Sequence, residues 1–331
     1  MFEFIVVILL VAIGFVVWMA FLPSVLSIER RLTIAASSQS VYSALRSLGT
    51  WPAWNPWLLQ EPNTKLTYSE TDDEVGSWLA WQGQWLGAGR VTHTHLQSTT
   101  QVHSQLTFEH PKRSPADIIW HLKPVTGGTE VNACLRNRLP FLMRWLNAKM
   151  SQQLALDLDI GLARLAMSVG DDSDPLVLQF VGVVTEPACH YVALRYEGSL
   201  QQRPEAMRAG YMRLAEWVEQ HNMEPNGTPL ALYHKLNPKT QWVVCDMALP
   251  VEHPQAVDDV FVGELPERRY LRTVLTGDYH YLEQAWHAAF SHLRLRRFKR
   301  QPDAPLLESY LNDPEVTSAA QRQTYLDIPL Q

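Results

Sequence analysis

Glu308 is the residue with the clearest potential for binding chemistry in this sequence. It lies in the stretch 305–314, where side chains alternate as in a β-strand and place Leu306, Glu308 and Tyr310 on one face. A carboxylate among apolar neighbours either reaches water at the rim or is buried and needs a partner, because burying an unpaired charge costs several kcal/mol. A buried Glu308 would suit a cation arriving from outside, whereas an exposed one would be an ordinary strand-end residue.

The sequence around Glu308 contains an internal repeat. Gly198 and Gly277 end two similar stretches and lie 79 residues apart, and Pro250 and Pro329 end two others at the same spacing of 79 residues. Each half reads as strand, helix, strand, strand. Two such halves can form one pseudo-two-fold β-α-β-β domain with a groove along its axis.

Residues 176–331 resemble the gyrase-inhibitor-like (GyrI-like) effector-binding family. The similarity is carried by Gly263-Glu264-Leu265-Pro266, Gly277-Asp278-Tyr279, Leu307-Glu308-Ser309-Tyr310 and the terminal residues 325–330. It implies that Glu308 faces a central pocket and pairs with cationic aromatic or amphiphilic ligands. The related strand of the first repeat carries Leu232-Tyr233-His234 and no matching acid, so one carboxylate is expected in the pocket.

Aromatic side chains are candidates for the walls of this pocket, because each aromatic face attracts a delocalised cation by roughly 0.5–2 kcal/mol. Ordinary core packing is the competing explanation for each residue taken alone. The candidates are Tyr233, Trp242, Tyr279, Trp286 and Tyr310.

Residues 28–170 are expected to form a separate α+β domain, joined to the second by the polar linker 171–175. A strand, a short helix and a run of antiparallel strands precede a long helix, whose apolar residues from Met143 to Leu165 form one stripe. In this layout an antiparallel sheet can wrap the long C-terminal helix.

Between the first helix and the strands stand Trp51, Trp54 and Trp57, with two prolines among them. This segment resembles the Trp-x-x-Trp-x-Pro-Trp signature of the START-type helix-grip family, also called SRPBCC or polyketide-cyclase-like. The resemblance runs from 28 to 166 and implies an apolar cavity, lined by these tryptophans, for a lipid-like or other hydrophobic ligand. Core packing is again the alternative.

Residues 1–27 are predicted to be a transmembrane anchor. The stretch 4–22 is nineteen residues without a charge, and as a helix it would span about 28 Å, close to the hydrocarbon thickness of a bilayer. A secretion signal is the alternative. Arg30 and Arg31 follow the segment, so the positive-inside rule predicts a single-pass protein with cytoplasmic soluble domains.

A basic run near the end of the chain is interpreted first as a solvated helix terminus. Contact with anionic lipid head groups is the alternative for a tethered domain. The cations are Arg294, Arg296, Arg297, Lys299 and Arg300.

Other functional classes find little support in the composition. The net charge of −6 argues against a nucleic-acid binder. The three cysteines have no paired spacing. His93 and His95 share a strand face, but no carboxylate or cysteine lies at ligand spacing beside them, so neither a metal nor a cofactor is predicted.

We therefore expect a membrane-anchored small-molecule-binding protein, with an apolar ligand in the first domain and a cationic or aromatic ligand in the second. Two alternatives remain open. One is a hydrolase of small reactive electrophiles, as some relatives of the second family are, in which Glu308 activates water beside Tyr310 or Tyr279. The other is an inhibitor or partner of another protein. No catalytic residue is assigned outside the hydrolase alternative.

Overall fold

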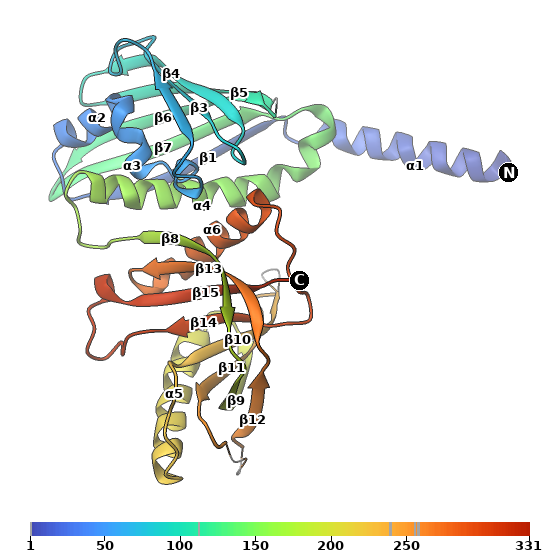
Figure 1. The fold of residues 1–331 in the computed structure, drawn as a ribbon. Coiled ribbons are helices and arrows are strands. Elements are labelled where there is room, and N and C mark those ends of the chain that lie inside the picture. Colours follow the sequence, from blue (N-terminus) through green and yellow to red (C-terminus); the bar gives the residue numbers. More distant parts are fainter. Residues whose placement is uncertain (1, 112, 238–239, 255, 257–258) are drawn as a thin grey trace. The chain divides into compact units, whose positions relative to one another are not determined.

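The computed structural model describes residues 2–331 except 112, 238–239, 255 and 257–258. The chain divides into two compact units, Met1–Ser173 and Asp174–Gln331 (Figure 1). Each unit has its own antiparallel sheet and its own apolar core.

The described part of the first unit contains a seven-stranded antiparallel sheet with helix α4 lying along it (Figure 1). The spatial order is β1-β7-β6-β5-β4-β3-β2. The strands are β1 (Val25–Ile34), β2 (Lys65–Tyr68), β3 (Trp78–Gln82), β4 (Ala88–Gln97), β5 (Gln101–His110), β6 (Arg113–Val125) and β7 (Gly128–Arg138); the helices are α1 (Phe2–Phe21), α2 (Ser38–Arg46), α3 (Trp51–Trp54) and α4 (Asn147–Ser168).

Local sequence signals set several of these boundaries. The Ser37 hydroxyl accepts a hydrogen bond from the backbone N–H of Ser40 at 3.1 Å and so caps α2. Gly127, with φ of +88°, supplies the left-handed residue in the turn from β6 to β7. The first strand of the unit, β1, pairs antiparallel with its last strand, β7.

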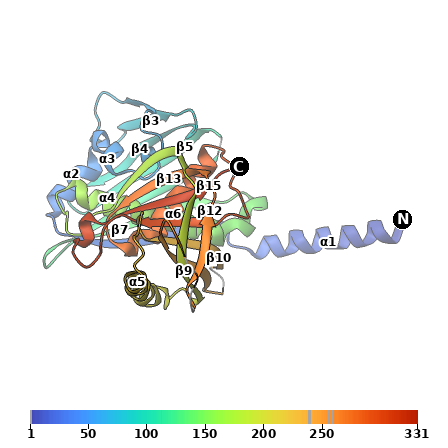
Figure 2. The ribbon, with the colours of Figure 1, turned by 60° about the horizontal axis from the view of Figure 1, so that its bottom comes forward.

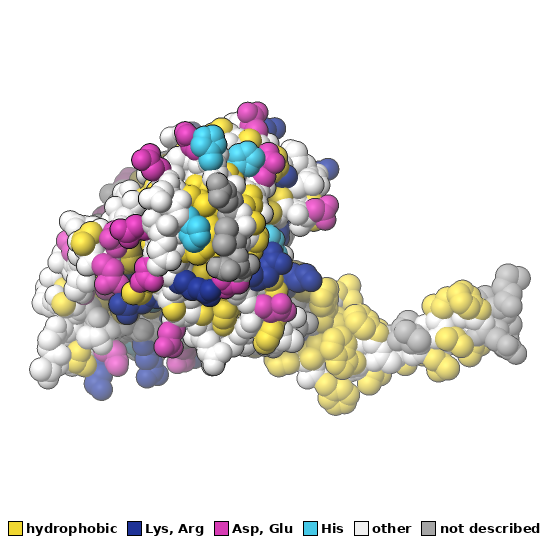
Figure 3. All heavy atoms as spheres, turned by 90° about the horizontal axis from the view of Figure 1, so that it is seen from below, with side chains coloured by type: hydrophobic (Ala, Val, Ile, Leu, Met, Phe, Trp, Pro, Cys, Tyr) yellow, Lys and Arg dark blue, Asp and Glu magenta, His cyan; other side chains and the backbone are white. Residues whose placement is uncertain are grey.

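The predicted membrane-spanning helix is wrong. The stretch does form α1, which exposes apolar side chains such as Phe4 and Phe21 (Figure 3). A spanning helix needs about 20 consecutive, strongly apolar residues. Among the described residues, no helix combines the length and the apolarity needed to cross a bilayer. The anchor at 4–22 and the single-pass membrane location with cytoplasmic domains are therefore unsupported.

The predicted fold class needs the same correction, because the described chain has two antiparallel sheets and no transmembrane helix. The basic run lies at and beyond the end of α6, with Arg294 in its last turn. There, Arg294 Nη2 donates to Ser291 Oγ at 2.9 Å. Contact of the basic run with lipid stays a prediction.

The second unit contains, in its described residues, an eight-stranded antiparallel sheet ordered β12-β9-β11-β10-β14-β15-β13-β8. Helix α5 packs on β9 and β11 (Figure 2), and α6 packs on β13 and β15. The strands are β8 (Val177–Glu186), β9 (Cys189–Ser199), β10 (Leu230–Asn237), β11 (Trp242–Pro250), β12 (Phe261–Leu265), β13 (Arg268–Thr276), β14 (Leu306–Tyr310) and β15 (Gln323–Pro329); the helices are α5 (Arg203–Gln220) and α6 (Leu282–Leu295).

The chain order within this unit repeats. Strand β9, helix α5 and strands β10 and β11 are followed by β13, α6, β14 and β15 in the same succession. The halves meet where β10 pairs with β14, with Ala231 opposite Glu308. The centre of the sheet is therefore the place where both repeats contribute side chains.

An ion pair to a buried aspartate marks the same position in each half. Arg195 donates from Nε and Nη2 to the two carboxylate oxygens of Asp246, at 2.8 and 3.1 Å. Arg272 does the same to Asp327, at 2.9 and 2.6 Å. Each pair joins adjacent strands and fixes their register, because a bidentate contact requires the two side chains to lie opposite each other.

The two pairs differ in their exposure to water. The side chain of Arg195 is 54% exposed and that of Arg272 is 14% exposed, although both aspartates are 1% exposed. Burial raises the pKa of Asp327 above its ordinary value in spite of Arg272. Burial also opposes ionisation of Asp246, but hydrogen bonds from His234 and Arg195 outweigh it and leave that pKa lowered.

We predict that Asp327→Asn destabilises the protein more than Asp246→Asn. Asp327→Asn leaves the largely buried Arg272 with only the more exposed Glu186, at 2.8 Å, as a charge partner, so we expect a cost of roughly 3 kcal/mol of unfolding free energy, the lower end for a broken buried ion pair. In Asp246→Asn, the exposed Arg195 can turn to water, so we expect roughly 1–3 kcal/mol. Urea unfolding of both variants measures the difference, and equal or reversed costs would contradict the explanation.

From the burial of His292 in α6 we predict that the folded protein loses stability in acid. The ring is 4% exposed and stacks on Phe180 at 4.4 Å between centroids, and burial lowers its pKa from 6.5 to about 4. The unfolded chain takes up a proton near pH 6.5 and the folded one only near pH 4. The stability that depends on a neutral His292 is therefore complete above pH 6.5 and is lost as the pH falls toward 4.

His292→Leu should flatten that part of the pH profile, since leucine has a similar volume and no proton to bind. We expect wild type to lose on the order of 2 kcal/mol more than the variant across this interval. Chemical unfolding at a series of pH values gives the comparison. Parallel profiles for the two proteins would exclude His292 as the cause.

Candidate ligand site around Glu308

Glu308 occupies the centre of the second unit's sheet. In β14 it lies between Ala231 of β10 and Leu326 of β15, and its side chain is 0% exposed. Leu306 and Tyr310, the residues two positions to either side, belong to the core between the sheet and its helices. Strand alternation therefore turns Glu308 toward the same apolar layer. Glu308 is therefore not a solvent-exposed residue at the end of a strand, which was the alternative considered from the sequence.

Three hydrogen-bond donors hold the carboxylate of Glu308. Trp286 Nε1, from α6, donates to Oε1 at 2.7 Å. The hydroxyls of Tyr233 and Tyr310 donate to Oε2 at 2.9 and 2.6 Å. All three donors are neutral. The oxygens of the carboxylate are therefore satisfied by side chains that carry no charge of their own.

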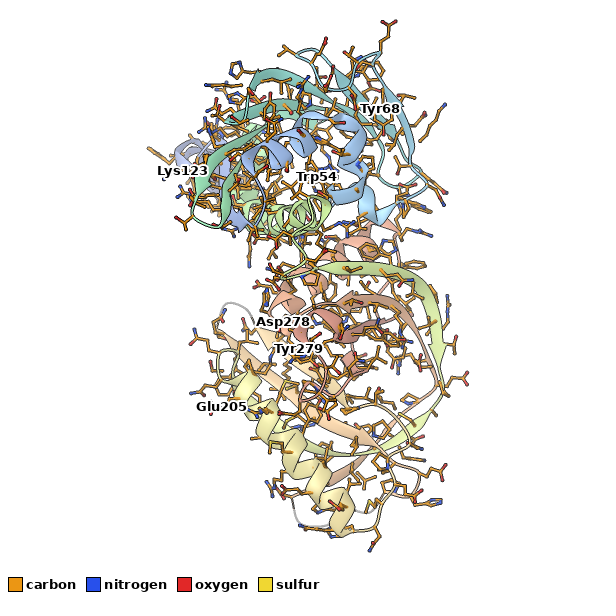
Figure 4. The ribbon with its side chains drawn as sticks, turned by 90° about the vertical axis from the view of Figure 1, so that its left-hand side faces the viewer. Trp54, Tyr68, Lys123, Glu205, Asp278 and Tyr279 are labelled. Atoms are coloured by element: carbon orange, nitrogen blue, oxygen red, sulfur yellow. The ribbon has the colours of Figure 1, made fainter. Side chains whose placement is uncertain are left out.

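A second layer of tyrosines surrounds these donors. Tyr211 of α5 and Tyr279 meet the ring of Tyr310 edge to face, at 5.9 and 5.5 Å between centroids. Figure 4 shows Tyr279 and its neighbour Asp278 on the same side of the unit as Glu205 in α5. Aromatic groups from α5 and from the segment that leads into α6 thus lie around the acid.

Burial and the negative charge of Glu308 keep the surrounding phenols protonated. Burial, and then the charge of Glu308, raise the pKa of Tyr211, Tyr233 and Tyr310 well above the ordinary value. The hydroxyls of Tyr233 and Tyr310 therefore remain donors throughout the neutral range.

Arg203, in the first turn of α5, was not predicted from the sequence. Its Nη1 donates to the Tyr233 hydroxyl at 3.2 Å, and its guanidinium carbon lies 5.6 Å from the centroid of that ring. Burial lowers the pKa of Arg203, but the electrostatic interactions with Tyr233 and Glu308 outweigh this and raise it. Arg203 is therefore a cation beside the acid. Its position at the start of the helix after β9 was the sequence feature that could have drawn attention to Arg203.

The structure brings most of the predicted pocket residues together. Tyr233, Trp286 and Tyr310 contact Glu308 directly, and Tyr279 joins them through Tyr310. Trp242 lies elsewhere, at the first position of β11 with 46% of its surface exposed. Tyr211, which contacts Tyr310, was missed because its position on α5 carried no distinguishing pattern.

In the first unit, the three predicted tryptophans line a small hollow between α3, the sheet and α4. Trp51 and Trp54 are buried, and Figure 4 shows Trp54 inside the unit. Trp57 is half-buried, and its Nε1 donates to Asp157 Oδ2 at 3.0 Å. Trp51 Nε1 donates to the carbonyl of Leu45 at 2.9 Å, which is a packing role.

The histidines of the first unit are held by other contacts. His93 is buried between Ser104 Oγ, at 2.9 Å, and the carbonyl of Arg46, at 2.8 Å. His95 lies across from His103, with ring centroids 5.1 Å apart. In the part of the chain that the structure describes, no group of three or more His, Cys, Asp or Glu is arranged to hold a metal ion.

Solved structures similar to this chain are distant. Protein CV1439 from Chromobacterium violaceum is 16% identical, covering 44% of this chain and 96% of its own, with a TM-score of 0.34. The C-terminal domain of EcmrR is 13% identical, over 48% and 98% of the two chains, with a TM-score of 0.37. SAV2435 bound to tetraphenylphosphonium is 13% identical, over 47% and 94%, with a TM-score of 0.35.

No curated protein matches the chain significantly. The predicted START-type domain is not confirmed by these comparisons and stays a prediction. One family profile, described as the GyrI-like small molecule binding domain, matches residues 181–331. Residues 181–331, within the second unit, therefore match a GyrI-like small-molecule-binding domain, in agreement with the motifs of that region.

Proposed function

We propose that this GyrI-like domain binds a small aromatic molecule that carries a cation or a strong hydrogen-bond donor, with Glu308 as its anionic partner. The observation that carries the proposal is the full burial of Glu308 among neutral donors. A carboxylate in such surroundings interacts more strongly with a cation than one in water, because less solvent screens the charge.

The aromatic enclosure defines the rest of the ligand. Trp286, Tyr279 and Tyr310 are half-buried, so these residues are partly exposed to solvent although Trp286 and Tyr310 contact the buried Glu308. A ligand reaches the acid by displacing one of them and offering its own donor in return. The rings that remain provide flat faces for stacking and for cation–π contact.

Hydrolysis of a reactive electrophile is a second candidate for the same site. The hydrogen bond of 2.6 Å between Tyr310 and Glu308 supports it, since a carboxylate beside a phenol can orient and deprotonate water. Product formation separates this function from binding alone. The role of the domain as an inhibitor or partner of another protein has no comparable support.

For the first unit, we propose an apolar ligand between the sheet and α4. The support is the hollow beside Trp54 and Trp57, which Gly161 of α4 also lines. The hollow is small, so this ligand must widen it as it enters. The natural occupant would be lipid-like or another hydrophobic molecule.

Glu308→Gln should weaken binding of an aromatic cation. The glutamine keeps the shape of the side chain but loses the charge, so we expect a loss of about tenfold to a hundredfold in affinity for the cationic ethyl ester of rhodamine B. Fluorescence anisotropy measures the affinity. Glu264→Gln, at an exposed position on β12, is the matched control and should bind as wild type does. Unchanged affinity in Glu308→Gln would refute the assignment.

Gly161→Leu should block an apolar ligand of the first unit. A Cβ at Gly161 would lie 3.4 Å from Pro56 Cδ, so the new side chain would extend into the hollow without a backbone clash. We expect Nile red fluorescence in the presence of the variant to fall severalfold relative to wild type. Ala148→Leu, at an exposed position on the same helix, serves as the control. Equal fluorescence with all three proteins would argue against this site.

A further inference from the structure

We infer that the ligand of the second unit is amphoteric: an aromatic molecule that presents a cation or donor to Glu308 and a carboxylate or similar anionic acceptor to Arg203. This inference rests on the proposed function and adds the second half of the recognition. Its basis is the position of Arg203 and the hydrogen bonds that its guanidinium makes and lacks.

Arg203 and Glu308 are joined through one tyrosine. Arg203 Nη1 donates to the Tyr233 hydroxyl at 3.2 Å, and that hydroxyl donates to Glu308 Oε2 at 2.9 Å. The guanidinium therefore belongs to the same hydrogen-bonded group as the acid, yet Tyr233 stands between the two charges.

Charge balance favours a ligand with both signs. The formal charges of Glu308 and Arg203 cancel, so a ligand with only a positive charge would leave a surplus cation in a largely buried site. Burying a charge without a partner is unfavourable, whereas a zwitterion adds one partner for each existing charge. The site is thus better suited to an amphoteric molecule than to a simple cation.

The guanidinium of Arg203 also has unused hydrogen-bonding capacity. Its Nε is buried and has no hydrogen-bond acceptor among the described residues. A guanidinium offers several N–H groups in a planar fork, and the planar carboxylate matches that fork with two parallel hydrogen bonds. An anionic group on the ligand would supply the missing acceptor.

The other arginine near the pocket is already occupied. Arg322 lies over the ring of Tyr279 at 5.3 Å, but it bonds to Asp278 at 3.3 Å and to the carbonyls of Thr317 and Pro314 at 3.3 and 3.0 Å. Its charge and its donors are therefore used within the protein. This comparison selects Arg203 as the group that a ligand would satisfy.

The test compares two dyes with the same aromatic cation. Rhodamine B carries a carboxylate beside its delocalised cation, and its ethyl ester keeps the cation without the anion. Fluorescence anisotropy with the full chain should show rhodamine B binding about tenfold more tightly than the ester, the gain expected for one charge-assisted contact.

Three variants locate that preference. Arg203→Met should remove it, because the side chain keeps its approximate length and loses its charge and donors. Arg203→Lys should retain part of it, because the charge remains without the fork. Arg208→Met, on the exposed side of the same helix, should bind both dyes as wild type does. Circular dichroism checks that each variant is folded.

The outcomes distinguish this inference from the function on which it rests. If wild type binds both dyes equally and Glu308→Gln weakens both, the domain binds cations and the amphoteric inference is wrong. If the preference for rhodamine B survives in folded Arg203→Met, Arg203 is not its source and the inference is also wrong. If wild type binds neither dye, or Glu308→Gln changes neither affinity, the proposed function fails and the inference fails with it.

Discussion

Burial of the Glu308 carboxylate among neutral donors is the interaction on which the site in the second unit depends. Water is replaced there by one indole and two phenols, which come from α6, β10 and β14 itself. These donors satisfy the oxygens of the acid without cancelling its charge. The arrangement requires both repeats of the unit, because Tyr233 belongs to the first and Trp286 to the second. Duplication of the half-domain is thus what places a charged group at the centre of a sheet.

The sequence was informative wherever a short-range pattern decides the outcome. Alternation in 305–314 correctly placed Glu308 and Tyr310 on one face, and the repeat spacing placed Tyr233 on the strand that pairs with β14. Pattern alone did not show that β11 begins at Trp242 and leaves this residue 46% exposed. The apolar residues of 4–22 predicted a membrane-spanning helix that the described structure does not support.

What the sequence could not provide was the contact between distant elements. Arg203 and Tyr211 lie on α5, and only the packing of that helix against the sheet brings them to the acid. With Arg203 included, the site changes from a negative pocket to one with both charges. In the first unit, Trp51 and Trp54 are buried and Trp57 is half-buried, and Trp51 uses its N–H within the core. The type of a residue therefore predicted whether it is buried better than it predicted its functional role.

The most direct test of the central claim is the indole N–H resonance of Trp286 in a nuclear magnetic resonance titration with an aromatic cation. That N–H donates to Glu308 at 2.7 Å, so a ligand that engages the acid must change its environment. The account predicts a large shift for Trp286 and none for Trp242, which is exposed at the start of β11. An unmoved Trp286 signal at saturating ligand would contradict it.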